Sequence, residues 1–519
     1  MKAILRTPML LIAIFLVALA ARIAALPGSG EANMTPDGAR LLNLVRSIER
    51  GSGFVTPEAW PAWLNPVSLP TPETFKEPGY PYIIAALRPI VSDGFRAGQI
   101  ISLVAGILLP LLTYAVMRAM EMEQRTAMVA GVFVAASPLL IQQSVYLMSD
   151  SLFAAMLMLA FWMALLAPGR GRNVHGYPTA FLSGIAFGLA FLVRAQAIFA
   201  LPSIVWALIS RRRRREAVTG VVLAALAAIL IYSPYLVRNL RVFGAPFHSD
   251  VSAALPYLDN ATLMHSLEHP PSSFVWTVEH PRAVAAHSLG GLRQLAVYVL
   301  PGHLLGQRMW LLPMALGLVI AIWDRRRWWF ALLYGVIMLV TIMPVSWLPR
   351  YFTSLVPFVA GLAALGLLKI VSYIDLIGPR LRRSVLAFVL IACACLLVLQ
   401  MDRARRGAPN TYTPELAAAR AYGPWLNERL GPGEAVMAET TSYWSWYSDR
   451  PSVYLVICDE ARFRKVVERL KVRWVALPLS RLGEFSERFP DGRLPGLLEP
   501  FVEDRDLDIA IFRVSSEGR

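Results

Sequence analysis

Two aspartates lie next to apolar segments of the sequence, and both could act as a general base. Asp37 stands in NMTPDGARLL and Asp150 in YLMSDSLF. Each position also suits the N-cap of a helix, a role for which Thr35 and Ser149 compete. Two carboxylates brought together could instead take a proton from an acceptor hydroxyl and stabilise the positive charge that develops. The sequence leaves both interpretations open.

Four basic residues lie at the ends of other apolar segments: Lys76 in FKEPGYPY, Arg194 in FLVRAQAIF, Arg238 in PYLVRNLRVFG and Arg350 in WLPRYFTSL. Taken singly, each could contact a lipid headgroup or pair with a carboxylate. Taken together they predict an anion site, because guanidinium forks and a lysine ammonium match phosphate oxygens. A phosphate bound at the edge of a bilayer would belong to a lipid.

The composition indicates that the elements positioning these residues cross a membrane. The 519 residues include 50 Lys and Arg against 35 Asp and Glu, a net charge of +15 that alone could indicate a nucleic-acid binder. However, 56% of the residues are hydrophobic, only 16% are charged, and the mean hydropathy is +0.51. Soluble domains carry about 25% charged residues, and disordered chains lack apolar ones. We therefore expect an all-α polytopic membrane domain with eleven spans, near residues 8–26, 96–117, 127–146, 151–167, 178–193, 195–210, 217–235, 309–323, 328–346, 351–371 and 384–401.

Basic residues in the short loops predict the orientation, because Lys and Arg are retained on the cytoplasmic side. With the N terminus in the cytoplasm, every basic cluster between spans falls on that side, including Arg211–Arg215 and Arg325–Arg327. The four basic candidates and both aspartates then lie at the outer face. Two long outer loops, residues 27–96 and 239–308, contain expected amphipathic surface helices. The first span is expected to be a retained anchor, although it shares features with a signal peptide.

Residues 402–519 have an ordinary soluble composition and predict a second domain after the membrane domain of residues 1–401. The β-type runs EAVMAET, SVYLVI, VRWVALPL and LDIAIFRV alternate with helical patterns, which is typical of a small α/β domain with a mostly parallel sheet. No glycine-rich phosphate loop opens its helices, so we expect no nucleotide site there. The topology places this domain outside the cytoplasm. Neither the three cysteines nor the histidines of the second outer loop have metal-ligand spacing, so no metal site is predicted.

The order of these features resembles the GT-C superfamily of integral-membrane glycosyltransferases, in the branch of the protein O-mannosyltransferases and the lipid A aminoarabinose transferase. The resemblance covers residues 5–400. It is carried by six stretches in the correct order and on one side of the membrane: PDGARLLNLVRSIERGSGF, KEPGYPYIIAAL, ASPLLIQQSVYLMSDSLF, GIAFGLAFLVRAQAIFALP, SPYLVRNLRVFGAP and RYFTSLVPFVAGLAALGL.

The resemblance implies a role for each candidate residue. Asp37 matches the catalytic carboxylate of the first outer loop, and Asp150 matches the second acid, which assists it or orients substrate or metal. The positions associated with the donor phosphate are Lys76, Arg194, Arg350 with its neighbour Tyr351, and, as a weaker match, Arg238. Many relatives carry a pair of acids or a metal-binding histidine near the first site. Here Asp37 is a lone acid in TPDG, so dependence on a divalent metal stays open.

These observations predict a glycosyltransferase of the bacterial cell envelope, a hexosyl- or pentosyltransferase. Its expected partners are a polyprenyl-phosphate-linked sugar donor, a glycan, lipid or protein acceptor, and membrane lipids; nucleic acid is not expected. A flippase or transporter of lipid-linked glycans is one alternative, although it should carry ionisable residues near mid-membrane and internal repeats. A glycan ligase or polymerase is another, and it differs in using a lipid diphosphate donor.

Overall fold

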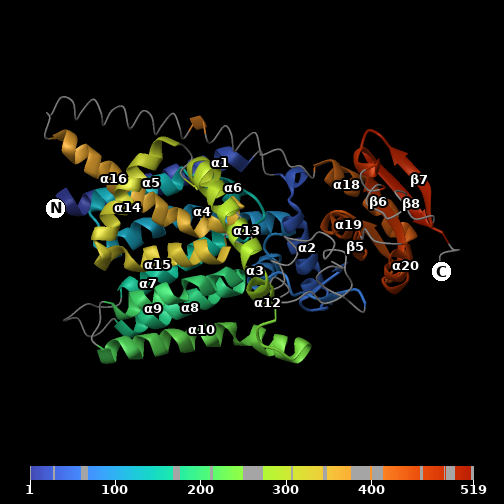
Figure 1. Ribbon diagram of the computed structural model, residues 1–519, viewed down its shortest axis with the longest axis horizontal. Helices are drawn as coiled ribbons and strands as arrows, with labels where there is room; N and C mark the ends of the chain where they lie inside the picture. The colour runs from blue at the N-terminus through green and yellow to red at the C-terminus, as the bar shows by residue number, and fades with distance from the viewer. Residues whose placement is uncertain are drawn as a thin grey trace. The chain divides into compact units, whose positions relative to one another are not determined.

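The computed structural model describes residues 2–26, 30–59, 68–166, 176–210, 214–248, 273–304, 308–342, 348–375, 398–399, 413–455, 460–483, 486 and 497–515. The chain divides into two compact units (Figure 1). Unit one comprises Met1–Ser29, Gly98–Phe247 and Val284–Ala408, and unit two comprises Gly30–Ala97, His248–Ala283 and Pro409–Arg519.

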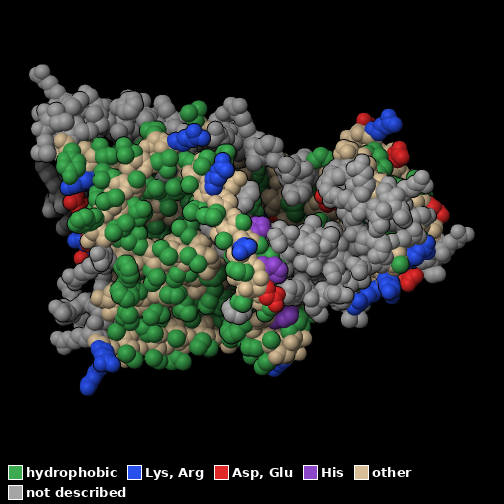
Figure 2. Space-filling model, viewed as in Figure 1, with side chains coloured by type: hydrophobic (Ala, Val, Ile, Leu, Met, Phe, Trp, Pro, Cys, Tyr) green, Lys and Arg blue, Asp and Glu red, His purple; other side chains and the backbone are tan. Residues whose placement is uncertain are grey.

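Unit one is built from apolar helices. Its face in Figure 2 is covered mainly by hydrophobic side chains. Large apolar residues such as Leu312, Leu230 and Val340 are 72%, 66% and 68% exposed, as expected for side chains that face lipid. The elements are α1 (Lys2–Ala25), α4 (Gly94–Ala119), α5 (Gln124–Ala135), α6 (Pro138–Val145), α7 (Asp150–Leu166), α8 (Gly176–Val193), η3 (Ala195–Ala200), α9 (Leu201–Ile209), α10 (Arg214–Phe243), α13 (Pro281–Gln294), η6 (Leu295–Leu304), η7 (Arg308–Trp310), α14 (Leu311–Trp323), α15 (Arg325–Ile342), η8 (Pro349–Leu355) and α16 (Val356–Asp375).

Several of these helices are long and apolar enough to cross a bilayer. Among the described residues four pass that test, and two bent helix pairs raise the number to six. The predicted span 127–146 is one such pair, since α5 and α6 meet at 54°. Pro138 opens α6 and Ser137 before it is extended, which ends the preceding helix. The predicted span 384–401 lies almost wholly outside the described residues, and the count of eleven stays a prediction.

Unit two contains a six-stranded mixed sheet in the order β2-β5-β4-β6-β8-β7. β2, β5, β4 and β6 are parallel neighbours, whereas β6, β8 and β7 pair antiparallel. The four predicted runs form β4, β5, β6 and β8; β2 and β7 were not predicted. The elements are α2 (Pro36–Glu49), β1 (Val55–Thr56), β2 (Glu58–Ala59), β3 (Thr71–Pro72), α3 (Gly79–Leu87), α12 (Ser273–Glu279), α18 (Thr413–Arg429), β4 (Ala435–Ala438), α19 (Thr441–Ser448), β5 (Ser452–Tyr454), α20 (Glu460–Arg469), β6 (Val472–Pro478), η9 (Leu479–Arg481), β7 (Leu498–Asp504) and β8 (Ile509–Val514).

The first outer loop folds together with the C-terminal residues. Residues 27–96 were predicted to belong to the membrane domain, whereas the structure groups residues 30–97 with 409–519. The reason is the pairing of β2 with β5, which brings Ala59 into the same apolar core as Val453, Val475 and Phe512. The expected helices of this loop are present as α2 and α3, and the inner side of α2 is buried.

Candidate functional site

Asp37 stands in the first turn of α2 without serving as its cap. Thr35 is the N-cap, and its hydroxyl accepts a hydrogen bond from the Gly38 backbone N–H at 3.1 Å. Pro36 at the first helical position needs no hydrogen-bond partner for its nitrogen. The Asp37 carboxylate is 22% exposed and accepts a hydrogen bond from the Lys76 ammonium at 2.6 Å. Thr35 rather than Asp37 therefore caps the helix, and Asp37 takes the first-turn position.

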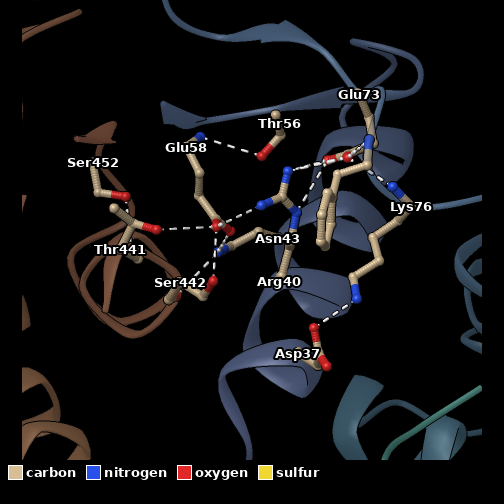
Figure 3. A network of polar contacts seen from close by, with 11 residues as sticks. Asp37, Arg40, Asn43, Thr56, Glu58, Glu73, Lys76, Thr441, Ser442 and Ser452 are labelled. Atoms are coloured by element: carbon tan, nitrogen blue, oxygen red, sulfur yellow. Dashed lines mark hydrogen bonds and ion pairs between the residues drawn. The ribbon is translucent and has the colours of Figure 1, made fainter. Parts of the chain in front are cut away.

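Lys76 is held by a tight turn around the carboxylate of Glu73. One Glu73 oxygen accepts hydrogen bonds from the backbone N–H groups of Phe75 at 2.6 Å and Lys76 at 2.9 Å. The guanidinium of Arg40 binds the same carboxylate through two nitrogens, at 3.1 and 3.3 Å. The Phe75 ring lies 5.2 Å from the Arg40 guanidinium carbon and 5.1 Å from the Lys76 nitrogen. The lysine is thus fixed toward Asp37 from both its backbone and its side chain (Figure 3).

A second set of charged side chains lies in unit one, at positions where one helix ends and the next begins. Asp150 is the first residue of α7, and its carboxylate is 1% exposed. Arg194 follows α8 and precedes η3 in an extended conformation, and its guanidinium donates a hydrogen bond to Asp150 Oδ1 at 2.5 Å. The other carboxylate oxygen, Oδ2, is buried and has no hydrogen-bond partner among the described residues. Asp150 is therefore placed first of all to hold Arg194.

Two arginines contact the ring of Tyr351 in the same unit. The guanidinium carbon of Arg194 lies 5.7 Å from the ring centroid, and that of Arg350 lies 5.3 Å from it. Arg350 and Tyr351 belong to η8, a short helix opened by Pro349. The Arg194 side chain is 15% exposed, and only one of its five N–H donors is used by Asp150. Two guanidinium groups on one ring form a site that could bind an anion.

Arg238 makes different contacts. It donates to the Asn239 side chain at 2.9 Å and lies over the rings of Tyr235 and Phe243, all on α10. The structure thus brings Asp37 together with Lys76, and Asp150 with Arg194, Tyr351 and Arg350.

Arg22 is a buried charge that the sequence analysis did not single out. It is 0% exposed in α1 and donates to the Ser144 hydroxyl at 3.2 Å and to the Ala135 carbonyl at 3.2 Å, at the break between α5 and α6. A Cβ at Gly106 would lie 2.0 Å from the Ser144 oxygen, so only glycine leaves room for this contact. The available signal was a lone arginine inside an apolar run, MLLIAIFLVALAARIAAL.

The described residues offer little for a metal ion. Among them no group of three or more His, Cys, Asp or Glu could hold one. The carboxylate of Asp37 is bound by a lysine, which is not a metal ligand in its charged form. Of the second-loop histidines, His265 and His269 lie outside the described residues, and the His280 ring stacks on Trp276 at 4.9 Å. A carboxylate paired with an ammonium group, as in Asp37 with Lys76, does not fit a divalent metal.

A family model described as dolichyl-phosphate-mannose-protein mannosyltransferase matches residues 72–237. The match includes Lys76, Asp150 and Arg194. Undecaprenyl phosphate-α-4-amino-4-deoxy-L-arabinose arabinosyl transferases from Pseudomonas aeruginosa are 30% identical over 184 residues, which is 33% of this chain and 32% of the relative. The match therefore spans about a third of the length of these relatives.

Solved structures resemble the whole chain in fold. The oligosaccharyltransferase of Archaeoglobus fulgidus superimposes with a TM-score of 0.64 at 14% identity, over 98% of this chain and 74% of the other. ArnT from Cupriavidus metallidurans bound to undecaprenyl phosphate gives a TM-score of 0.56 at 14% identity, over 98% of both chains. At such identities the likeness concerns the fold alone.

Proposed function

We propose that this chain, a member of the GT-C superfamily of integral-membrane glycosyltransferases, transfers a sugar from a polyprenyl-phosphate-linked donor to an acceptor hydroxyl. The acceptor is a glycan, a lipid or a protein. The reaction takes place on the outer face of the cytoplasmic membrane, where nucleotide sugars are absent and a lipid-linked sugar is the available donor. In this orientation the N terminus is cytoplasmic and unit two is periplasmic or extracellular.

The observation that carries the proposal is the contact of Arg194 and Arg350 with Tyr351 at the ends of apolar helices. A lipid phosphate has its charged group at the membrane boundary and its tail among such helices. Asp150 holds Arg194 in place before the donor arrives, so little reorganisation is needed when the phosphate binds. The name of the curated relatives, which transfer a sugar from undecaprenyl phosphate, supports the same donor class.

In the proposed reaction Asp37 acts as the general base. It accepts the proton of the acceptor hydroxyl while the hydroxyl oxygen forms a bond to the anomeric carbon of the donor. The bond from that carbon to the phosphate oxygen breaks, and its electron pair leaves with the lipid phosphate. Arg194 and Arg350 stabilise the negative charge that the phosphate gains, and the anomeric configuration is inverted by this single displacement.

Transfer assays in proteoliposomes test this function. Purified protein is supplied with polyprenyl-monophosphate sugars, with polyprenyl-diphosphate sugars, and with a panel of acceptors. Asp37→Asn should lower transfer about 10²- to 10⁴-fold, the range typical of a lost general base. Glu49→Gln is the matched control, because Glu49 lies on the same helix and pairs with Arg88 at a partly exposed position. Equal transfer by Asp37→Asn and wild type would contradict the catalytic assignment.

The donor arms separate the alternatives. Transfer from the monophosphate donor supports the proposal. Transfer only from the diphosphate donor would identify a ligase or polymerase, and lipid translocation without transfer would identify a flippase. Each of these two results would overturn the proposed donor or the proposed reaction.

A further inference from the structure

A continuous series of buried polar contacts runs from the C-terminal sheet to the Asp37–Lys76 pair (Figure 3). It begins at the sheet edge, where β2 pairs with β5 and the Ser452 backbone N–H donates to the Pro57 carbonyl at 3.0 Å. Glu58 in β2 is the first charged residue of the series. All members belong to unit two.

Glu58 is fully buried and is bound from two sides. On one side, α19 supplies the hydroxyls of Ser442 at 2.7 Å and Thr441 at 3.3 Å. On the other side, α2 supplies the Asn43 side-chain N–H at 2.9 Å and the Arg40 guanidinium at 3.7 Å. The carboxylate of Glu58 therefore joins a C-terminal helix to the helix that carries Asp37.

The series continues with charges of alternating sign. Arg40 is 4% exposed and lies between the carboxylates of Glu58 and Glu73. Glu73 in turn fixes the turn that presents Lys76, and Lys76 binds Asp37. Arg40 also stands three residues after Asp37 on α2, so the two side chains lie on the same side of the helix. These contacts connect Glu58 to the Asp37–Lys76 pair through Arg40 and Glu73.

A purely structural role would not require this arrangement. Buried ion pairs contribute little net stability, because desolvation offsets the attraction between the charges. Contacts nearer the surface already attach α2 to α19: Arg50 binds Asp449 at 2.7 Å, and Arg46 lies 4.0 Å from the Trp446 ring. The three buried charged groups are therefore not needed to attach α2 to α19. They fix the orientation of the side chains that lead to Asp37.

We infer that Glu58 is a positioning residue for the general base, and that the C-terminal residues of unit two are part of the catalytic machinery. This inference rests on the proposed function, since Asp37 is the base in that proposal. Glu58 touches no reacting atom; it acts through Arg40, Glu73 and Lys76. Residues 402–519 were predicted to form a separate domain; in this proposal residues of that segment help to align Asp37.

The test compares Glu58→Gln with Arg50→Gln in the full-length protein. Glutamine keeps the size and one acceptor oxygen of Glu58 but removes the charge that Arg40 requires. Arg50→Gln removes a contact between the same two helices that does not lead to Asp37. Thermal unfolding in detergent establishes that both variants are folded, and kcat is expressed per folded protein.

Three readouts separate a positioning role of Glu58 from a purely structural one. Glu58→Gln should lower kcat about tenfold or more, since small displacements of a catalytic group cost about that much. The acid limb of its kcat/KM profile should move to lower pH, because Arg40 with one fewer carboxylate partner favours the ionised form of Asp37. Independently of activity, amine-reactive labelling followed by peptide mass spectrometry should show that Lys76 is modified several-fold faster in Glu58→Gln than in the wild-type protein. Arg50→Gln should leave all three unchanged.

The outcomes are distinct. Faster Lys76 labelling in Glu58→Gln supports the positioning role even if wild-type protein transfers no sugar, a result that would overturn only the proposed function. If wild-type protein transfers sugar and Glu58→Gln matches it in kcat, in pH profile and in Lys76 labelling, the inference is wrong. Equal effects of Glu58→Gln and Arg50→Gln would also overturn it, because the series of buried contacts would then serve only to attach α2 to α19.

Discussion

Replacing Asp150 by asparagine tests what the second acid does. Its carboxylate is 1% exposed, and Oδ1 is bound to Arg194 at 2.5 Å. A base occupied by an arginine and shielded from solvent is poorly placed to accept a substrate proton. We therefore expect Asp150 to orient Arg194 for the donor phosphate rather than to share proton transfer with Asp37. Asparagine keeps an acceptor oxygen but loses the charge on that hydrogen bond.

The size of the effect follows from the bond that is weakened. A hydrogen bond to a charged group contributes about 1.5–3 kcal/mol, and each 1.4 kcal/mol corresponds to about a factor of ten. If the loss falls on donor binding, Asp150→Asn should raise the donor KM about 10- to 100-fold. The kcat at saturating donor should fall far less than in Asp37→Asn.

The assay measures initial rates in proteoliposomes at several donor concentrations and at saturating acceptor. Asp150→Ala serves as the more severe variant, since it leaves the guanidinium of Arg194 without its partner. A loss of kcat equal to that of Asp37→Asn, with the donor KM unchanged, would refute the positioning role. It would instead support two aspartates that share base catalysis.

Two further predictions concern the donor site and unit two. Tyr351→Leu should weaken donor binding about 5- to 30-fold, because two cation–π contacts contribute about 1–2 kcal/mol together. Tyr351→Phe keeps the ring and should retain the wild-type donor KM. Equal donor KM values for the Leu and Phe variants would contradict a role of the ring. Burial raises the pKa of Glu415, which accepts hydrogen bonds from Thr440 and Trp444, so the stability of the folded state should decline as the pH rises from about 4.5 through the raised pKa. Glu415→Gln cannot ionise and should flatten this decline in thermal unfolding measured across that range; an unchanged slope would show that other groups cause it.

Regular patterns were predictable from the sequence, and pairings with distant residues were not. The runs that form β4, β5, β6 and β8 are mainly apolar, and each contains at least one β-branched residue, so local preference and burial agree. β2 has two residues, Glu58 and Ala59, and its pairing partner lies near the other end of the chain. No local signal identifies such a strand. The boundary of unit two was missed for that reason.

The break between α5 and α6 shows a second limit of prediction from the sequence. Residues 127–146 are apolar throughout, and by composition they resemble one span. The Ser137–Pro138 pair could have indicated a break in the helix. The contact that satisfies the freed Ala135 carbonyl could not be predicted, because its donor, Arg22, comes from a different helix. Arg22 was overlooked because its partners become visible only when α1 packs against this break.

In the candidate site, too, the residues could be singled out from the sequence, but their partners could not. Sequence position marked Asp37 and Asp150 equally, since each follows an apolar segment and each could cap a helix. Their surroundings distinguish them: Asp37 is partly exposed and binds a lysine ammonium, whereas Asp150 is buried and binds an arginine that also contacts Tyr351. A general base must reach a substrate proton, and a positioning acid must not be displaced by solvent. We therefore propose different roles for the two aspartates on the basis of what surrounds them, and the types of residue alone could not have suggested this difference.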